Sequence, residues 1–195
     1  GANTFSGGVS LNVGTIKIAN SSALGTGALM MSGGVMMSDS TTGRSISNAY
    51  VLSGGVTLGN ATNSGTLSFT GAGSLSSSVL LNNPSTVDFS GVIAGSNELT
   101  KNGLGTLILR GMNTFSGGIT LNAGSLEIGS DLALGTGSVT LNGGSVSSDG
   151  VAARFVANAV GMGSVTIGNA LKSGVLTLSG QVSLLSNATL TVASD

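Results

Sequence analysis

Apolar residues recur at every second position in short stretches of this chain, and small or polar residues separate the stretches. Val9 and Leu11 flank Ser10, for example. Eight segments share this alternation: residues 9–11, 16–18, 56–58, 67–69, 119–121, 126–128, 165–167 and 176–178. A period of two predicts short β-strands with one buried and one solvent-facing side.

Turns are predicted between these strands, because Gly, Asn and Ser gather there and allow sharp corners. No segment of ten or more residues has a convincing helical pattern. The nearest candidate is 152–160, where Phe155 and Val156 suit a strand equally well. Many short strands with a turn at each end are typical of a sandwich, a barrel or a solenoid.

An internal repeat favours the solenoid. Residues 1–39 recur as residues 111–149, an offset of 110, and 20 of these 39 positions are identical without a gap. After the loss of one residue, segment 56–71 recurs as 165–180. A fixed period indicates units stacked along one axis. We expect one solenoid over residues 1–195, with repeat unit 1 at 1–110 and a partial repeat unit 2 at 111–195.

The repeat length sets the expected dimensions. If a unit of 110 residues forms five coils, each coil has about 22 residues and the chain has roughly nine rungs. Residue 1 lies in the middle of a repeat, so we expect the chain to be an excerpt of something longer.

Low charge agrees with stacking. Charged residues make up 7% of the chain and the net charge is −1. Equivalent residues in successive rungs lie about 4.8 Å apart, where like charges repel but Ser, Thr and Asn can form hydrogen-bonded ladders. Lys17 is replaced by Glu127 in the second copy, which predicts a solvated position. Without a basic patch or a long apolar run, we expect no nucleic-acid binding and no membrane insertion by this segment.

Residues 99–144 resemble the autotransporter-associated β-strand repeat. The resemblance is carried by Gly103-x-Gly105-Thr106-Leu107, Gly111-x-Asn113-Thr114-Phe115-Ser116-Gly117-Gly118, Leu121-Asn122-x-Gly124, Leu134-Gly135-x-Gly137 and Val139-Thr140-Leu141-Asn142-Gly143-Gly144. Residues 1–34 carry a second copy without its lead-in. This resemblance implies a right-handed parallel β-helix (β-solenoid) in the passenger region of a bacterial surface or secreted protein. The family repeat is structural, so it implies no catalytic residues.

The chemistry available to the chain is limited. It has no His and no Cys, which removes histidine triads, thiol nucleophiles and the usual zinc sites. Asp39 and Arg44 recur as Asp149 and Arg154. This could be a charged groove for polysaccharide cleavage, or a turn aspartate paired with a surface arginine. A catalytic pair would rarely occur twice in one short rod, so we expect no catalytic, cofactor-binding or metal-binding residues and no cofactor.

Aromatic platforms for glycans are also scarce, because Trp is absent and Tyr50 is the only Tyr. Val160 matches Tyr50 in the second copy, which predicts an apolar position there. Phe5 and Phe115 stand beside Gly-Gly corners, which predicts packing in the core or at a corner. A cluster of methionines is expected to fill core gaps rather than to form a binding patch: Met30, Met31, Met36 and Met37.

The expected function is therefore structural or adhesive. We expect a non-enzymatic, surface-displayed or secreted β-solenoid segment of a bacterial autotransporter-like protein or fibre, outside the cell. The alternative is a polysaccharide-active or glycan-binding β-helix protein. Expected partners are a second rod in head-to-tail self-association into a filament, and a host-surface or matrix ligand.

Overall fold

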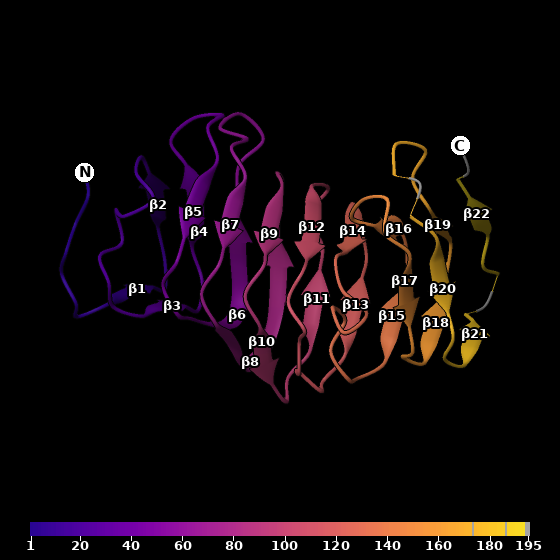
Figure 1. The fold of residues 1–195 in the computed structure, drawn as a ribbon. Helices are drawn as coiled ribbons and strands as arrows, with labels where there is room; N and C mark the ends of the chain where they lie inside the picture. Colours follow the sequence, from indigo (N-terminus) through magenta and orange to yellow (C-terminus); the bar gives the residue numbers. More distant parts are fainter. Residues whose placement is uncertain (173, 186, 194–195) are drawn as a thin grey trace.

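The chain forms a single stack of parallel strands that winds about one axis (Figure 1). The computed structural model describes residues 1–172, 174–185 and 187–193. Within these residues there are 22 strands and no helix, and every ladder between two strands is parallel. The predicted all-β solenoid of roughly nine rungs is confirmed.

Three faces make up the stack. The first face begins with β1, whose residues 9–11 pair with residues 29–31. Its strands are β1 (Val9–Leu11), β3 (Leu29–Met31), the first parts of β6 (Tyr50–Leu58) and β8 (Gly73–Asn82), β10 (Ile93–Gly95), β17 (Arg154–Val156) and β20 (Leu176–Leu178). Between β10 and β17 this face consists of backbone without regular strands, which still bonds to its neighbours, as from Thr114 N to Ile93 O at 2.9 Å.

The second face is the most regular. Its nine strands are β2 (Thr15–Ile18), β4 (Val35–Ser38), the later parts of β6 and β8, β11 (Leu99–Lys101), β13 (Ile119–Leu121), β15 (Val139–Leu141), β18 (Val160–Met162) and β21 (Val182–Leu184). Because β6 and β8 continue around a corner, the first and second faces join in one 12-stranded sheet.

The third face is a separate sheet of eight strands. They are β5 (Arg44–Ile46), β7 (Leu67–Phe69), β9 (Val87–Phe89), β12 (Thr106–Leu109), β14 (Ser125–Ile128), β16 (Ser145–Ser148), β19 (Val165–Ile167) and β22 (Leu190–Val192). All eight segments predicted from the alternating pattern lie in strands of the three faces.

The core fills the interior of the coil. On β13, Ile119 and Leu121 are buried and Thr120 points outward, as the period of two predicts. One part of the core is aromatic: the ring centroids of Tyr50 and Phe69 are 5.2 Å apart, and those of Phe69 and Phe89 4.9 Å. The glycine at position 73 makes room for this stack, because any β-carbon there would overlap the Tyr50 ring.

The two repeat units do not occupy the same faces. Paired strands are 19 to 25 residues apart in sequence. β1 lies on the first face, whereas its counterpart β13 lies on the second, between β11 and β15. Likewise β2 lies on the second face and its counterpart β14 on the third. The unit of 110 residues therefore makes five and one third turns, not the five coils expected from its length.

Candidate functional site

The two Asp–Arg pairs singled out from the sequence do form in the structure. Arg44 Nη2 lies 2.6 Å from Asp39 Oδ1, and Arg44 Nε donates to the carbonyl oxygen of Ile18 at 3.1 Å. The hydrogen bond from Arg44 lowers the pKa of Asp39. Each pair closes a loop between consecutive strands, so the arginine ties that loop to the preceding rung.

The second copy has the same arrangement. Arg154 Nη2 lies 3.2 Å from Asp149 Oδ1, and Arg154 Nε donates to the carbonyl oxygen of Ile128 at 3.3 Å. In both copies the aspartate is held by an arginine. This geometry supports a turn aspartate paired with an arginine.

Around Asp149 the pair extends into a charged cluster on the outer side of the third face. Arg110 forms ion pairs with two aspartates. Its Nε lies 3.0 Å from Asp88 Oδ2, and its Nη1 pairs with Asp149 Oδ2. Lys172, on the loop between β19 and β20, pairs with Glu127. These residues lie on or just after β9, β12, β14, β16 and β19, so the ion pairs connect residues of five successive rungs.

The expectation that Glu127 would be solvated is wrong. Lys17, its counterpart in the first copy, is exposed on the second face, but Glu127 is only 6% exposed. The physical reason is the rotation by one third of a turn, which places Glu127 on the third face within reach of Lys172. A single sequence cannot show this, because the two positions match in the repeat and differ in their surroundings.

No pattern in the sequence points to Lys101, which is buried in the structure. It occupies the inward column between Leu81 and Leu121, and its side chain is fully buried. Its Nζ donates to the carbonyl oxygens of Gly103 at 2.6 Å and Ala123 at 2.9 Å. Burial lowers the pKa of Lys101 to about 8. The ammonium group thus joins the corners of two successive rungs.

Most of the aromatic and methionine expectations are confirmed. Tyr50 is 2% exposed and Phe115 is fully buried in the core. Phe5 differs, because it is 46% exposed even though it lies against Gly25, as Phe115 lies against the glycine at 135. Three of the clustered methionines, Met31, Met36 and Met37, are buried, and Met30 is half exposed.

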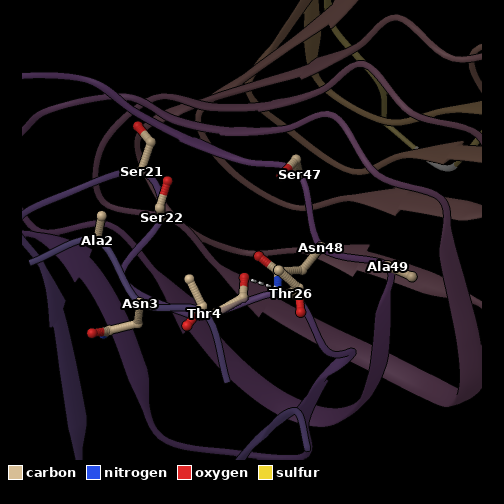
Figure 2. A pocket seen from close by; sticks show the side chains of 10 residues that line it. Ala2, Asn3, Thr4, Ser21, Ser22, Thr26, Ser47, Asn48 and Ala49 are labelled. Atoms are coloured by element: carbon tan, nitrogen blue, oxygen red, sulfur yellow. Dashed lines mark hydrogen bonds between the residues drawn. The ribbon is translucent and has the colours of Figure 1, made fainter. Parts of the chain in front are cut away.

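A cavity of about 430 Å³ lies beside the first rungs (Figure 2). Its walls carry small and neutral polar side chains: Ala2, Asn3, Thr4, Ser21, Ser22, Thr26, Ser47, Asn48 and Ala49. Asn48 is already bonded there, since its Nδ2 donates to the carbonyl oxygens of Gly25 at 3.2 Å and Gly27 at 2.7 Å. No acid, base or thiol lines this cavity.

Over the described part of the chain, no three carboxylates come together in a way that could hold a metal ion. The same residues include no helix with the length and apolar character needed to cross a bilayer.

The polar residues of the repeat motif are instead bonded within the stack. Asn113 Oδ1 accepts from Ile93 N at 2.7 Å, and Asn113 Nδ2 donates to the carbonyl oxygen of Ala133 at 2.6 Å. One buried amide therefore connects three successive rungs. Gly105 allows its rung to pack closely against the preceding one, because a β-carbon there would overlap the carbonyl oxygens of Ser85 and Asn83.

On the outer side of the second face, asparagines form a ladder. Asn142 Nδ2 donates to Asn122 Oδ1 at 2.8 Å, and Asn122 Nδ2 donates to Asn102 Oδ1 at 2.7 Å. Hydroxyls do the same on the third face, where the Oγ atoms of Ser125 and Ser145 are 2.9 Å apart. These contacts confirm the predicted hydrogen-bonded ladders.

Comparison with known families identifies the motif. The sequence model of the passenger-associated-transport-repeat, a repeat of autotransporter passenger domains, matches residues 1–18 and 99–128. The second match covers β11 to β14, and so includes Lys101, Gly105 and Asn113. Comparison with curated proteins and with solved structures gives no significant match.

Proposed function

Because the chain carries the passenger-associated-transport-repeat in two segments, we propose that it serves as a non-catalytic rod in the passenger region of a surface-displayed or secreted bacterial protein. One observation carries the proposal: polar and glycine residues within the matched segment 99–128 are engaged in contacts inside the stack. Asn113, Lys101 and Gly105 all serve contacts between rungs.

Rod-like mechanics follow from this bonding. Each rung bonds to the next through a parallel ladder and buries aliphatic side chains against it, so load along the axis is shared by many equivalent contacts. The proposed role is to hold other parts of the protein away from the cell, or to present the rod's own surface to a host-surface or matrix ligand. Head-to-tail association of rods into a filament stays a prediction.

Single-molecule pulling tests the mechanical role. The chain has no Cys, so one cysteine added at each end gives unique attachment points. We expect rungs to come away singly or in small groups, each of about 20 residues adding roughly 70 Å of extended chain. One all-or-none event that releases the whole chain would contradict a stack of semi-independent rungs.

The alternative function is tested by turnover. A panel of acidic polysaccharides is incubated with the chain and with the variants Asp39→Asn and Asp149→Asn, and new reducing ends are measured. The rod proposal expects no release above the buffer control. Release that either variant abolishes would establish a polysaccharide-active enzyme and overturn the rod proposal.

Light scattering of the chain tests the predicted filament. A strict monomer at all concentrations refutes head-to-tail association.

A further inference from the structure

Four large apolar side chains lie exposed on consecutive rungs at the start of the first face. They are Val92, Met112, Leu132 and Phe155, with exposed fractions of 41%, 64%, 51% and 53%. We call these four residues the apolar stripe. Hydrogen bonds fix their alignment: Thr114 N donates to Ile93 O, Asn113 N donates to Leu132 O, and Phe155 N donates to Asp131 Oδ1.

Three of the four residues of the apolar stripe, Met112, Leu132 and Phe155, belong to the second copy. At the matching positions of the first copy, offset by 110, Met112, Leu132 and Phe155 are replaced by Ala2, Ser22 and Ser45. Within the stripe's own column, Ala72 precedes Val92, and Thr177, paired with Phe155, follows it. The apolar side chains therefore form a bounded patch and are not a requirement of the coil.

The apolar area of the stripe limits how strongly a partner could bind to it. Four half-exposed side chains of this size offer a few hundred Å², close to the largest apolar patch that monomeric proteins usually leave uncovered. A stable pair of proteins buries about 800 Å² on each partner, so this stripe alone would support weak, reversible pairing. Its row of side chains repeats every rung, about 4.8 Å apart, and a second rod has the same repeat.

Charges beside the apolar stripe complement each other when one rod is turned end over end. Arg110 precedes Met112; its side chain is 40% exposed and also pairs with Asp88 and Asp149 of its own rod. Asp131 precedes Leu132, is exposed, and forms no ion pair with the described residues. In an antiparallel pair centred between Met112 and Leu132, the Asp131 of each rod faces the Arg110 of the other.

We propose that a second copy of this chain docks antiparallel along the apolar stripe, so that rods associate side by side. Val92 then faces Phe155 of the second rod, and Met112 faces Leu132. This lateral contact is separate from head-to-tail association, which would use the ends of the coil. It does not depend on the proposed function.

Sedimentation velocity over a concentration series tests the pairing. The variant Met112→Ala, Leu132→Ser and Phe155→Ser introduces the residues of the first copy. We expect reversible association of the unchanged chain, and at least a tenfold weaker association constant for the variant. The matched control changes three exposed apolar residues elsewhere, Met30→Ser, Leu80→Ser and Leu104→Ser, and should associate like the unchanged chain. A monomer throughout, or equal loss in the control, overturns the proposal.

Disulfide trapping tests the orientation and does not depend on the triple variant folding. The single variants Met112→Cys and Leu132→Cys are mixed and oxidised mildly. Antiparallel docking predicts the mixed Met112→Cys–Leu132→Cys disulfide in excess over either symmetric disulfide. Symmetric Met112→Cys disulfides in excess would indicate parallel rods and overturn the docking, as would a statistical mixture.

Discussion

Lys101 places an ammonium group where neighbouring rungs have leucines. It is held there by two carbonyl oxygens and no carboxylate among the described residues. Because burial lowers its pKa to about 8, the folded state binds this proton less tightly than the unfolded chain does. Stability from this group is therefore present at high pH and is lost as the pH falls through about 8.

Between pH 8 and pH 9.5, the free energy of unfolding should rise with pH in the unchanged chain, and this rise should be smaller in Lys101→Met. Urea unfolding at several pH values measures it. The range stops below pH 10 because burial raises the pKa of Tyr50, whose ionisation in the unfolded chain would then lower stability. Equal slopes in both proteins would show that Lys101 is not the titrating group.

The glycine at 105 lies where two rungs approach closely, so a larger residue should destabilise the stack. A methyl group there would meet the carbonyl oxygens of two residues of the neighbouring rung, so Gly105→Ala should lower the free energy of unfolding by about 2 kcal/mol or more. Gly150→Ala is the matched control, since no atom lies within 4 Å of a β-carbon at that position. It should change stability by less than about 0.5 kcal/mol. Thermal or urea unfolding measures the stability of the two variants. A similar loss of unfolding free energy in both would contradict the packing argument.

Between elements, the asparagine ladder ties β11, β13 and β15 together from outside. Asn122 both donates and accepts in the ladder, whereas Asn142 only donates to Asn122. Removing Asn122 therefore breaks two bonds, and removing Asn142 breaks one. At about 0.5–1.5 kcal/mol for each bond, Asn122→Ala should cost about twice as much stability as Asn142→Ala. Urea midpoints compare the two, and an equal cost would mean that the ladder does not stabilise the stack.

The ion pair between Glu127 and Lys172 holds the loop before β20 against β14. Glu127 is nearly buried, so Lys172→Met leaves a carboxylate without its cation, which should cost about 3 kcal/mol. The double variant Glu127→Leu, Lys172→Met removes both charges and should recover most of that loss. Unfolding of the single and double variants measures the coupling. A double variant less stable than the single one would contradict it.

The strands and turns could be predicted from the sequence because local alternation and glycine corners determine them. The repeat also determined the stacking. The position of Glu127 could not be predicted, since burial there depends on which face a strand reaches and on a loop some 45 residues later. The buried Lys101 was equally hidden, because the carbonyl oxygens that hold it belong to corners of two rungs. No single charged residue reveals such a contact by itself.

For the whole molecule, the stack predicts graded protection. Side chains of β21 and β22 are exposed, whereas those of β7 and β9 contribute buried aromatic residues to the core. In the 195-residue chain, amide hydrogen exchange should be fastest in β20–β22 and slowest around β7–β12, because each rung is stabilised mainly by its neighbours. Exchange measured by mass spectrometry checks this. Uniform protection along the chain would indicate one cooperative unit instead.

The fractional turn of the repeat unit has a geometric consequence. Any feature written once per 110 residues reappears about 120° around the axis, so three units in succession would distribute it to all three sides after 16 turns, roughly 77 Å at the spacing of parallel strands. Such a screw-like arrangement separates identical loops in direction as well as in height. A rod built this way would offer the same epitope to approaching partners from every side, without the chain having to encode three different versions of it.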